Sequence, residues 1–513
     1  MKTIIAGLFI TLFLPLGLWA QEDDFVALKG GCMPDVTGDA AAGGAKRAHR
    51  YLPSRRTDWD AAKTYKQMVI LFTFTDTDFS MEGGNSKANE FYNKMFNEAG
   101  YNLYSGKGCV ADYFREQSGG LANFVFDVYG PVQVNSKAVG VENPTEDTKF
   151  YGASLMREAT QKVLEANPAV DYSQYDWNGD GTIEQVVYIY AGLPGNLKTS
   201  SGECYGHIWP VTSSFPTLTT PDGKKISNYT ASGEKWPTNT YRPCGLGTVC
   251  HEFSHSLGLP DIYPVGKFSI ISAVDEWDLM DGGNFTNYGW CPPNYSSLEK
   301  MLMGWLTPTE LTEAATITDM KPVSEGGVVY QIKKSDTEYL LLENRQWTGW
   351  DAGLPGKGLA VFSVNYDVAA WSNNSVNSFS SEASFRYKMV HADGLTYDGW
   401  VDKKEADNLS NYQNSLRMNS YMLSTSPFPY NTNAKCELIT GKSVTNIQQH
   451  TDGTVSFDFM GGTSSAVEAV RTAADRRVEA VYDLAGRRVQ TPVAGRLYIV
   501  RLANGETVKY HKK

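Results

Sequence analysis

The chain has 513 residues, of which 42% are hydrophobic and 20% charged, and its 12 Trp and 29 Tyr are typical of folded rather than disordered protein. This length exceeds what one ordinary hydrophobic core organises, so several domains are expected. A formal net charge of −11 argues against a nucleic-acid partner, because phosphate binding needs a basic surface.

Residues 1–20 are typical of a signal peptide. A Lys precedes an apolar run from Ile4 to Leu18, and Ala20 stands before a polar stretch. No later segment approaches 18 uninterrupted apolar residues, so we expect an exported protein that is secreted or held at the cell surface. A retained N-terminal anchor is the alternative. Residues 21–62 contain small residues and basic clusters without a sustained apolar period, and are predicted to be a prosegment or linker.

Residues 63–306 alternate between strand and helix patterns, which predicts an α/β domain. In chain order, the expected elements are a strand over Met68–Phe74, helices over Glu90–Glu98 and Val110–Gln117, a strand over Asn123–Val134, a helix over Gly152–Ala166 and a strand over Val186–Tyr190.

Oxygen-bearing side chains recur through one short loop of this region, namely Asp176, Asn178, Asp180, Thr182 and Glu184. With Gly181 at the sharp turn, the pattern matches the first half of an EF-hand loop and predicts a calcium site. Val187 stands where the bidentate Glu of an EF-hand would be, and a strand follows instead of a helix. A turn without an ion, closed by its own side-chain hydrogen bonds, is the alternative.

A metal-binding pattern follows in the sequence CHEFSHSLGLPD. His251 and His255 lie four residues apart, so on a helix both imidazoles face one side and reach one metal ion. Zinc needs a third protein ligand and an exchangeable water. Gly258 is expected to end the helix, after which Asp261 is the predicted third ligand. Glu276 is the alternative third ligand.

Glu252 is the predicted catalytic base. Zinc lowers the pKa of a bound water towards about 7, and Glu252 would accept the water proton and pass it to the leaving amine. Met280, in WDLMDGG, is predicted to form a Met-turn beneath the zinc ligands, with simple core packing as the alternative. Cys250 is expected to pack as a small apolar residue or to form a disulfide.

Seven cysteines are an odd number for an exported protein, so one thiol is expected to be free or to lie in a removed segment. Cys32, in GCMPDV, resembles the switch segment of matrixin propeptides. The resemblance implies a thiolate on the fourth zinc position until cleavage near Arg50 or Arg56 releases it. A disulfide or an idle Cys32 is the alternative.

The extended pattern HExxHxxGxxD, the preceding element order, the DxNxDG loop and WDLMDGG resemble the immune inhibitor A-like metallopeptidases, a family of secreted bacterial proteases. The resemblance reaches residue 460 through Leu342–Gln346, Gly349–Asp351 and His391–Gly394. It implies a metzincin-like zincin domain, endopeptidase activity on protein or peptide substrates, and zinc at the predicted ligands. Phe362-Ser363 replaces the Trp-His that relatives often show, so no role of that His is carried over.

From residue 307 to 460, short strand-like runs such as Tyr339–Leu342 and Gly358–Val364 are separated by turn residues, which predicts an all-β sandwich domain. The expected fold class is therefore multidomain, an α/β zincin domain followed by all-β domains.

Residues 461–513 follow a Gly- and Ser-containing break, with strands expected at Val478–Leu484, Arg496–Leu502 and Thr507–Tyr510. YDLAGRRV and GRLYIV within this unit resemble a sorting domain of the type IX secretion system. The resemblance implies the secretion machinery as a partner and passage across an outer membrane. An immunoglobulin-like module is the alternative.

Two other functions compete with a protease: an inactive zincin scaffold, and a surface adhesin that binds through its β-domains. The intact HExxH pattern favours the protease, because neither alternative needs Glu252. We expect a monomer.

Overall fold

The computed structural model describes residues 25–27, 56–138, 152–199, 208–238, 240–265, 273–379, 381–395, 423–462, 478–483, 487–489, 497–502 and 507–511. The predicted signal peptide and Cys32 lie outside these residues, as does most of the predicted prosegment. Within the described ranges, no helix is both long and apolar enough to cross a bilayer.

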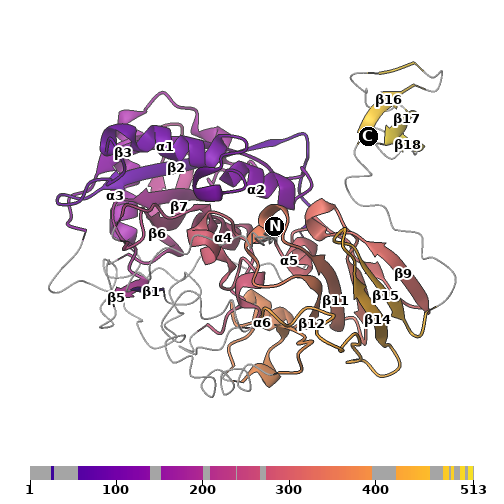
Figure 1. The fold of residues 1–513 in the computed structure, drawn as a ribbon. Coiled ribbons are helices and arrows are strands. Elements are labelled where there is room, and N and C mark those ends of the chain that lie inside the picture. The colour runs from indigo at the N-terminus through magenta and orange to yellow at the C-terminus, as the bar shows by residue number, and fades with distance from the viewer. Residues whose placement is uncertain are drawn as a thin grey trace, which may run out of the picture.

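The N-terminal half is built on a five-stranded sheet with the strand order β3-β2-β4-β7-β6 (Figure 1). Four strands are parallel, β2 (Thr64–Thr73), β3 (Asn123–Gln133), β4 (Val186–Tyr190) and β7 (Lys225–Gly233), and the edge strand β6 (Val211–Thr219) runs antiparallel to β7. A separate two-stranded pairing joins β1 (Phe25–Ala27) to β5 (Leu197–Thr199).

Alternate residues of β2 point to opposite faces of the sheet, as strand geometry requires. Val69 and Leu71 join one hydrophobic cluster, and Ile70 and Phe72 join another. The first cluster also contains the buried apolar residues of α1 (Asn85–Asn97), α2 (Val110–Gln117) and α4 (Leu246–Leu257), and the second contains those of α3 (Ala153–Ala166). The predicted mixed α/β pattern of this region is confirmed, with helices on both faces of the sheet.

Residues 309–459 are rich in strands and form two further sheets, with the orders β13-β12-β11-β10-β8 and β14-β15-β9. The strands are β8 (Thr309–Glu310), β9 (Ala315–Met320), β10 (Tyr330–Lys333), β11 (Glu338–Arg345), β12 (Gly358–Asn365), β13 (Tyr387–Met389), β14 (Val444–Gln449) and β15 (Val455–Phe459). The short helix α5 (Ser297–Leu302) precedes these sheets, and α6 (Val368–Ser372) follows β12.

Short 3-10 segments connect many of these elements. They are η1 (Leu103–Ser105), η3 (Tyr172–Tyr175), η4 (Asp275–Trp277), η5 (Gly283–Gly289), η6 (Val323–Glu325), η7 (Gly349–Gly353) and η8 (Glu382–Ser384).

Strand β11 connects the two halves of the core. Leu340 and Leu342 lie in the cluster shared with the three-stranded sheet, whereas Tyr339 and Leu341 lie in the cluster that contains α1, α2 and α4. The sheet β13-β12-β11-β10-β8 thus packs with one face against the three-stranded sheet and with the other against the α/β part. One hydrophobic core therefore continues across residue 306, the predicted boundary.

The last strands, β16 (Val478–Tyr482), β17 (Leu497–Leu502) and β18 (Thr507–His511), form an antiparallel sheet of their own. The three strands expected in this unit are confirmed to within two residues at each end. Their sorting role stays a prediction.

Candidate metal centre

Helix α4 carries both histidines through the protein interior. Every residue of Leu246–Leu257 is buried except Ser256. The start of the helix packs backbone to backbone against η5, since a Cβ added to Gly247 would lie 2.1 Å from the carbonyl oxygen of Asn284. Only glycine fits this contact, which holds the helix close to the segment after η4.

The helix ends at Gly258, whose φ of 112° is left-handed. Its N–H donates to the carbonyl of His255 at 2.9 Å, and the N–H of Leu259 donates to the carbonyl of Ser254 at 3.0 Å. These bonds close the last turn and redirect the chain, so that Asp261 returns towards the histidines.

Replacing Gly258 by Ala is expected to lower the free energy of unfolding by about 1–3 kcal/mol, because the added Cβ disfavours this backbone conformation. Urea unfolding of the full chain measures the loss. Gly258→Asn is the matched variant, because Asn tolerates left-handed backbone better than Ala. Its loss should be smaller, and equal losses for the two variants would contradict the assigned conformation.

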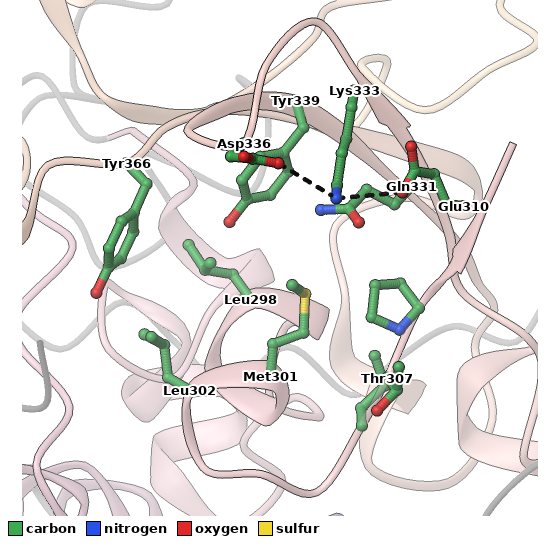
Figure 2. Close-up of a pocket in the computed structure, with 12 residues that line it drawn as sticks. Leu298, Met301, Leu302, Thr307, Glu310, Gln331, Lys333, Asp336, Tyr339 and Tyr366 are labelled. Carbon is green, nitrogen blue, oxygen red and sulfur yellow. Dashed lines mark ion pairs between the residues drawn. The ribbon is translucent and has the colours of Figure 1, made fainter. Parts of the chain in front are cut away.

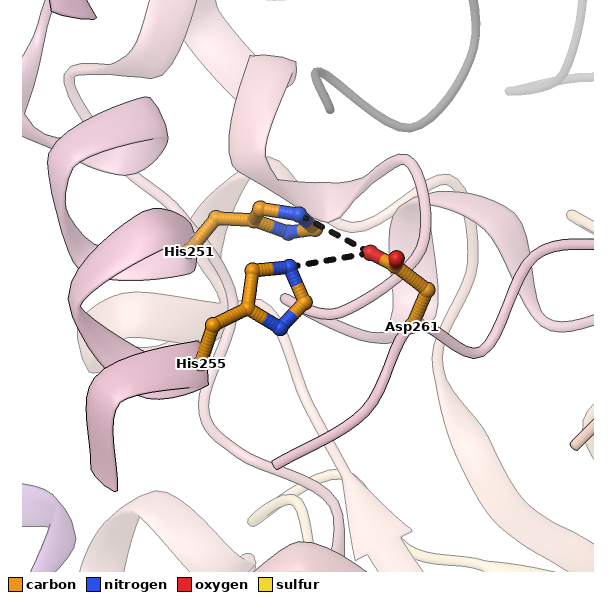
Figure 3. A group of neighbouring side chains, drawn as sticks. All are labelled: His251, His255 and Asp261. Atoms are coloured by element: carbon orange, nitrogen blue, oxygen red, sulfur yellow. Dashed lines mark ion pairs between the residues drawn. The ribbon is translucent and has the colours of Figure 1, made fainter. Parts of the chain in front are cut away.

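The structure brings His251, His255 and Asp261 together, with ligand atoms within 4.8 Å of one another (Figure 3). Asp261 Oδ1 lies 3.3 Å from His251 Nε2 and 3.0 Å from His255 Nε2. All three residues are at most 1% exposed. The third ligand predicted from the sequence thus lies beside both imidazoles, whereas Glu276 is not a member of this group of described residues.

Backbone carbonyls fix the orientation of both imidazoles. His251 Nδ1 lies 2.7 Å from the carbonyl oxygen of Leu279, and His255 Nδ1 lies 2.7 Å from that of Leu259. A carbonyl only accepts hydrogen bonds, so each Nδ1 carries the proton. With a cation bound, both rings would be neutral, and each Nε2 and the carboxylate oxygen of Asp261 would direct a lone pair at the ion.

The donor set fits zinc. Two imidazole nitrogens and one carboxylate oxygen are the ligand types of a catalytic zinc site that keeps one position open. A tetrahedral ion with bonds of about 2.1 Å separates its ligand atoms by roughly 3.4 Å. The observed separations of 3.0 and 3.3 Å are close to this spacing.

The charge of Asp261 is maintained in the interior. Although burial acts to raise the pKa of Asp261, the two neighbouring imidazoles hold it well below its ordinary value. Against the lowering effect of burial, the carboxylates of Asp261 and Glu252 raise the pKa of His251. The carboxylate is therefore anionic at neutral pH and available to a cation.

Glu252 follows the first histidine and is fully buried. The hydroxyl of Thr212, on edge strand β6, donates to Glu252 Oε2 at 3.0 Å and lies 2.8 Å from the Glu252 carbonyl oxygen. Strand β6 therefore holds the carboxylate in one orientation beside the histidines.

Met280 lies in the buried turn beside this group. Its carbonyl accepts the N–H of Ile262 at 2.9 Å, and its N–H donates to Asp278 Oδ1 at 2.8 Å. Since the neighbouring Leu279 carbonyl orients His251, the backbone of the turn supports the histidine and the loop of Asp261. The location fits the predicted Met-turn.

The predicted calcium loop is closed by its own hydrogen bonds. Asp176 accepts the N–H groups of Gly179 at 2.8 Å and Gly181 at 2.9 Å, and its Oδ2 also pairs with Lys224 Nζ at 2.9 Å. Glu184 accepts the N–H of Trp177. An ammonium group thus already neutralises the first acid of the loop, and the structure lends calcium no support.

A hollow lies away from the candidate metal centre, between α5 and strands β8 and β10. It has a volume of about 480 Å³ and is floored by Leu298, Met301 and Leu302 (Figure 2). At its rim, Lys333 pairs with Glu310 at 3.1 Å. None of the histidines or Asp261 lines it, so the hollow is separate from the candidate metal centre.

Five of the seven cysteines lie in the described part of the chain, and all five are free: Cys109, Cys244, Cys250, Cys291 and Cys436. The disulfide considered for Cys250 is therefore not formed, and its other expected role, apolar packing, is the one observed. Burial raises the pKa of its thiol well above the ordinary value. Cys32 and Cys204 lie outside the described residues.

Two residues of this centre have no signal in the sequence. Thr212 contacts Glu252 from 40 positions away, and Asn374 contacts Asp261 from 113 positions away. Neither belongs to a motif of fixed spacing, so only the tertiary fold reveals them.

Comparison with known proteins agrees with this geometry. Residues 57–303 match the family described as immune inhibitor A peptidase M6, catalytic domain. Immune inhibitor A of Bacillus thuringiensis subsp. alesti is 23% identical over 276 residues, which is 46% of this chain and 39% of the relative. The pre-pro-metalloprotease PrtV of Vibrio cholerae serotype O1 (strain M66-2) is 23% identical over 234 residues, which is 41% of this chain and 25% of the relative.

The aligned region thus spans well under half the length of either relative. The family match includes the three predicted ligands, Glu252 and Met280, and it ends before the strand-rich part, which contains Asn374. These similarities support the peptidase M6 family for residues 57–303, and with it an enzyme of the metalloendopeptidase class.

Proposed function

We propose that the chain is a secreted zinc-dependent endopeptidase that hydrolyses peptide bonds of protein substrates. One observation carries the proposal: His251, His255 and Asp261 converge on a single buried point, with Glu252 on the same helix as both histidines. The similarity of residues 57–303 to metallopeptidases supports the same reaction.

Different residues have different roles in the proposed reaction. His251, His255 and Asp261 would hold zinc, which supplies a Lewis acid that activates water and polarises the scissile carbonyl. Glu252 accepts the proton of the attacking water and delivers it to the leaving amine. Thr212, through its hydrogen bond to Oε2, keeps the carboxylate of Glu252 oriented during both transfers.

The predicted prosegment, residues 21–62, would keep the enzyme latent. We propose that cleavage near Arg50 or Arg56 activates the enzyme, because the Cys32 thiolate would then leave the fourth zinc position. Cleavage there leaves the matched residues 57–303 intact. The Cys32 switch belongs to this proposal, and the uncleaved Cys32→Ser precursor should then be active. A Cys32→Ser precursor as inactive as the parent would reject the switch.

A surface adhesin on an inactive zincin scaffold is the competing function. It gives no reason for a buried carboxylate next to the metal ligands, held by a hydroxyl from another strand. The geometry therefore favours the protease.

Metal removal tests the function. The processed protein should hydrolyse casein, lose this activity after dialysis against a zinc chelator and regain it when about one equivalent of zinc is returned. Magnesium at the same concentration is the control and should not restore the rate. Hydrolysis that persists in the chelated protein, or no hydrolysis of any protein by the zinc-loaded form, would reject the proposal.

The remaining sequence predictions are the signal peptide, export through a C-terminal sorting domain, the division into domains at residues 306 and 460, and a monomer.

Calcium in the loop of Asp176 also stays a prediction, and the ion would compete with Lys224 for the Asp176 carboxylate. If calcium binds there, it should raise the Tm of the full chain relative to a chelated sample. An unchanged Tm would reject calcium.

A further inference from the structure

Asn374, in the turn after α6, contacts the predicted third zinc ligand at two points. Its side-chain Nδ2 donates to Asp261 Oδ2 at 2.7 Å, and its Oδ1 accepts the backbone N–H of Asp261 at 2.7 Å. Because a backbone N–H only donates, Oδ1 must face it and the amide orientation is determined. Asn374 is 2% exposed.

These two bonds determine which oxygen of Asp261 is available. Oδ2 is engaged by the amide of Asn374, whereas Oδ1 faces His251 and His255. The amide thus holds the carboxylate in one rotamer and presents a single oxygen to the metal position. Groups that orient a ligand in this way raise the metal affinity of a site, and their loss typically weakens it about 10–100-fold.

Asn374 is itself held rigidly. The N–H of Ser375 donates to the carbonyl of Ala370 at 2.9 Å, and Asn374 adopts a left-handed backbone with φ of 54°. Three residues on, Asn377 donates to the carbonyl of Ile262 at 2.8 Å. Residues 374–377 therefore form hydrogen bonds to two neighbouring residues of the Asp261 loop, Asp261 itself and Ile262.

We propose that Asn374 is a positioning residue of the zinc centre, supplied by the part of the chain that lies beyond the match to the peptidase catalytic domain. This inference rests on the proposed zinc-dependent function. The metal centre is then completed by two parts of the fold, and the shared hydrophobic core around Trp371, which is fully buried, maintains their relative position.

The test compares zinc affinities of the full chain and its variants by competition with a chromophoric chelator. Asn374→Gly removes the amide but allows the left-handed backbone. If Asn374 served only to adopt this backbone conformation, the variant would therefore keep the parental zinc affinity. We expect zinc to bind this variant about 10–100-fold more weakly than the parent. The neighbouring Asn373, which is exposed, provides the matched control Asn373→Ala, for which we expect the parental affinity.

Two further readouts separate positioning from folding. The zinc-free Asn374→Gly protein should unfold within a few degrees of the zinc-free parent. Its cobalt-substituted form should show an altered visible spectrum, because the ligand geometry changes. If Asn374→Gly does not fold, Asn374→Ser takes its place, since it removes the amide without adding a charge beside Asp261.

The outcomes are distinguishable. Parental zinc affinity and an unchanged cobalt spectrum in Asn374→Gly would overturn the positioning role and leave the proposed function intact. A parent that binds no zinc would overturn the proposed function and this inference with it.

Discussion

Replacing Glu252 by Gln is expected to lower kcat/KM for protein hydrolysis by about 10²–10⁴-fold or more, with zinc still bound. The amide keeps the size of the carboxylate and still accepts the hydrogen bond of Thr212, but it cannot take a proton from water. Hydrolysis of casein and of a quenched peptide by the processed protein, with zinc content measured on the same samples, provides the comparison.

Glu276→Gln is the matched control for Glu252→Gln. Glu276 is half-buried, lies near the Met280 turn and is outside the ligand group, so this variant should keep both its zinc and its activity. Full activity in Glu252→Gln would remove the proposed base. Loss of zinc from Glu276→Gln would instead revive Glu276 as the third ligand.

Replacing Arg345 by Met is expected to lower the free energy of unfolding by about 3–5 kcal/mol. The guanidinium is fully buried and binds Asp351 through two hydrogen bonds of 2.7 Å. It also pairs with Glu343 at 3.2 Å. Without Arg345, the two carboxylates stay buried without their common cation, and removing one partner of such a group is strongly destabilising.

Denaturant unfolding of the full chain measures this loss. Lys334→Met is the control, because Lys334 forms an exposed pair with Glu338 and exposed pairs contribute at most about 1 kcal/mol. Similar stabilities of the two variants would show that the buried charges are not coupled as the structure indicates. Arg345→Lys should also be destabilised, since one ammonium cannot replace the two-point contact with Asp351.

Local spacing made much of the metal centre predictable. Two histidines four residues apart share a helix face, and Gly258 turns the chain so that Asp261 follows at once. Asn374 and Thr212 depend on contacts between distant segments, for which the sequence has no periodic or spacing signal. The structure adds them as hydrogen-bond partners of Asp261 and Glu252.

In the fold, too, local sequence patterns made some elements predictable, whereas contacts between distant segments had no signal in the sequence. Strand β2 has a continuous apolar run and was predictable, because it is buried on both faces of the sheet. Strands β6 and β7 were missed, since both are rich in Ser and Thr and β6 contains Pro216, which favours an edge position. The change of pattern at residue 307 is visible in the sequence, but it does not reveal that the core continues across it.

In the proposed function, His251, His255 and Asp261 hold one zinc ion. The most direct test is the zinc content of the dialysed full chain, of His255→Ala and of the control His450→Ala, whose exposed imidazole contacts Ser456. We expect about one zinc per chain in the parent and the control, and far less in His255→Ala. Full zinc content in His255→Ala, or no zinc in any of the three proteins, would contradict this expectation.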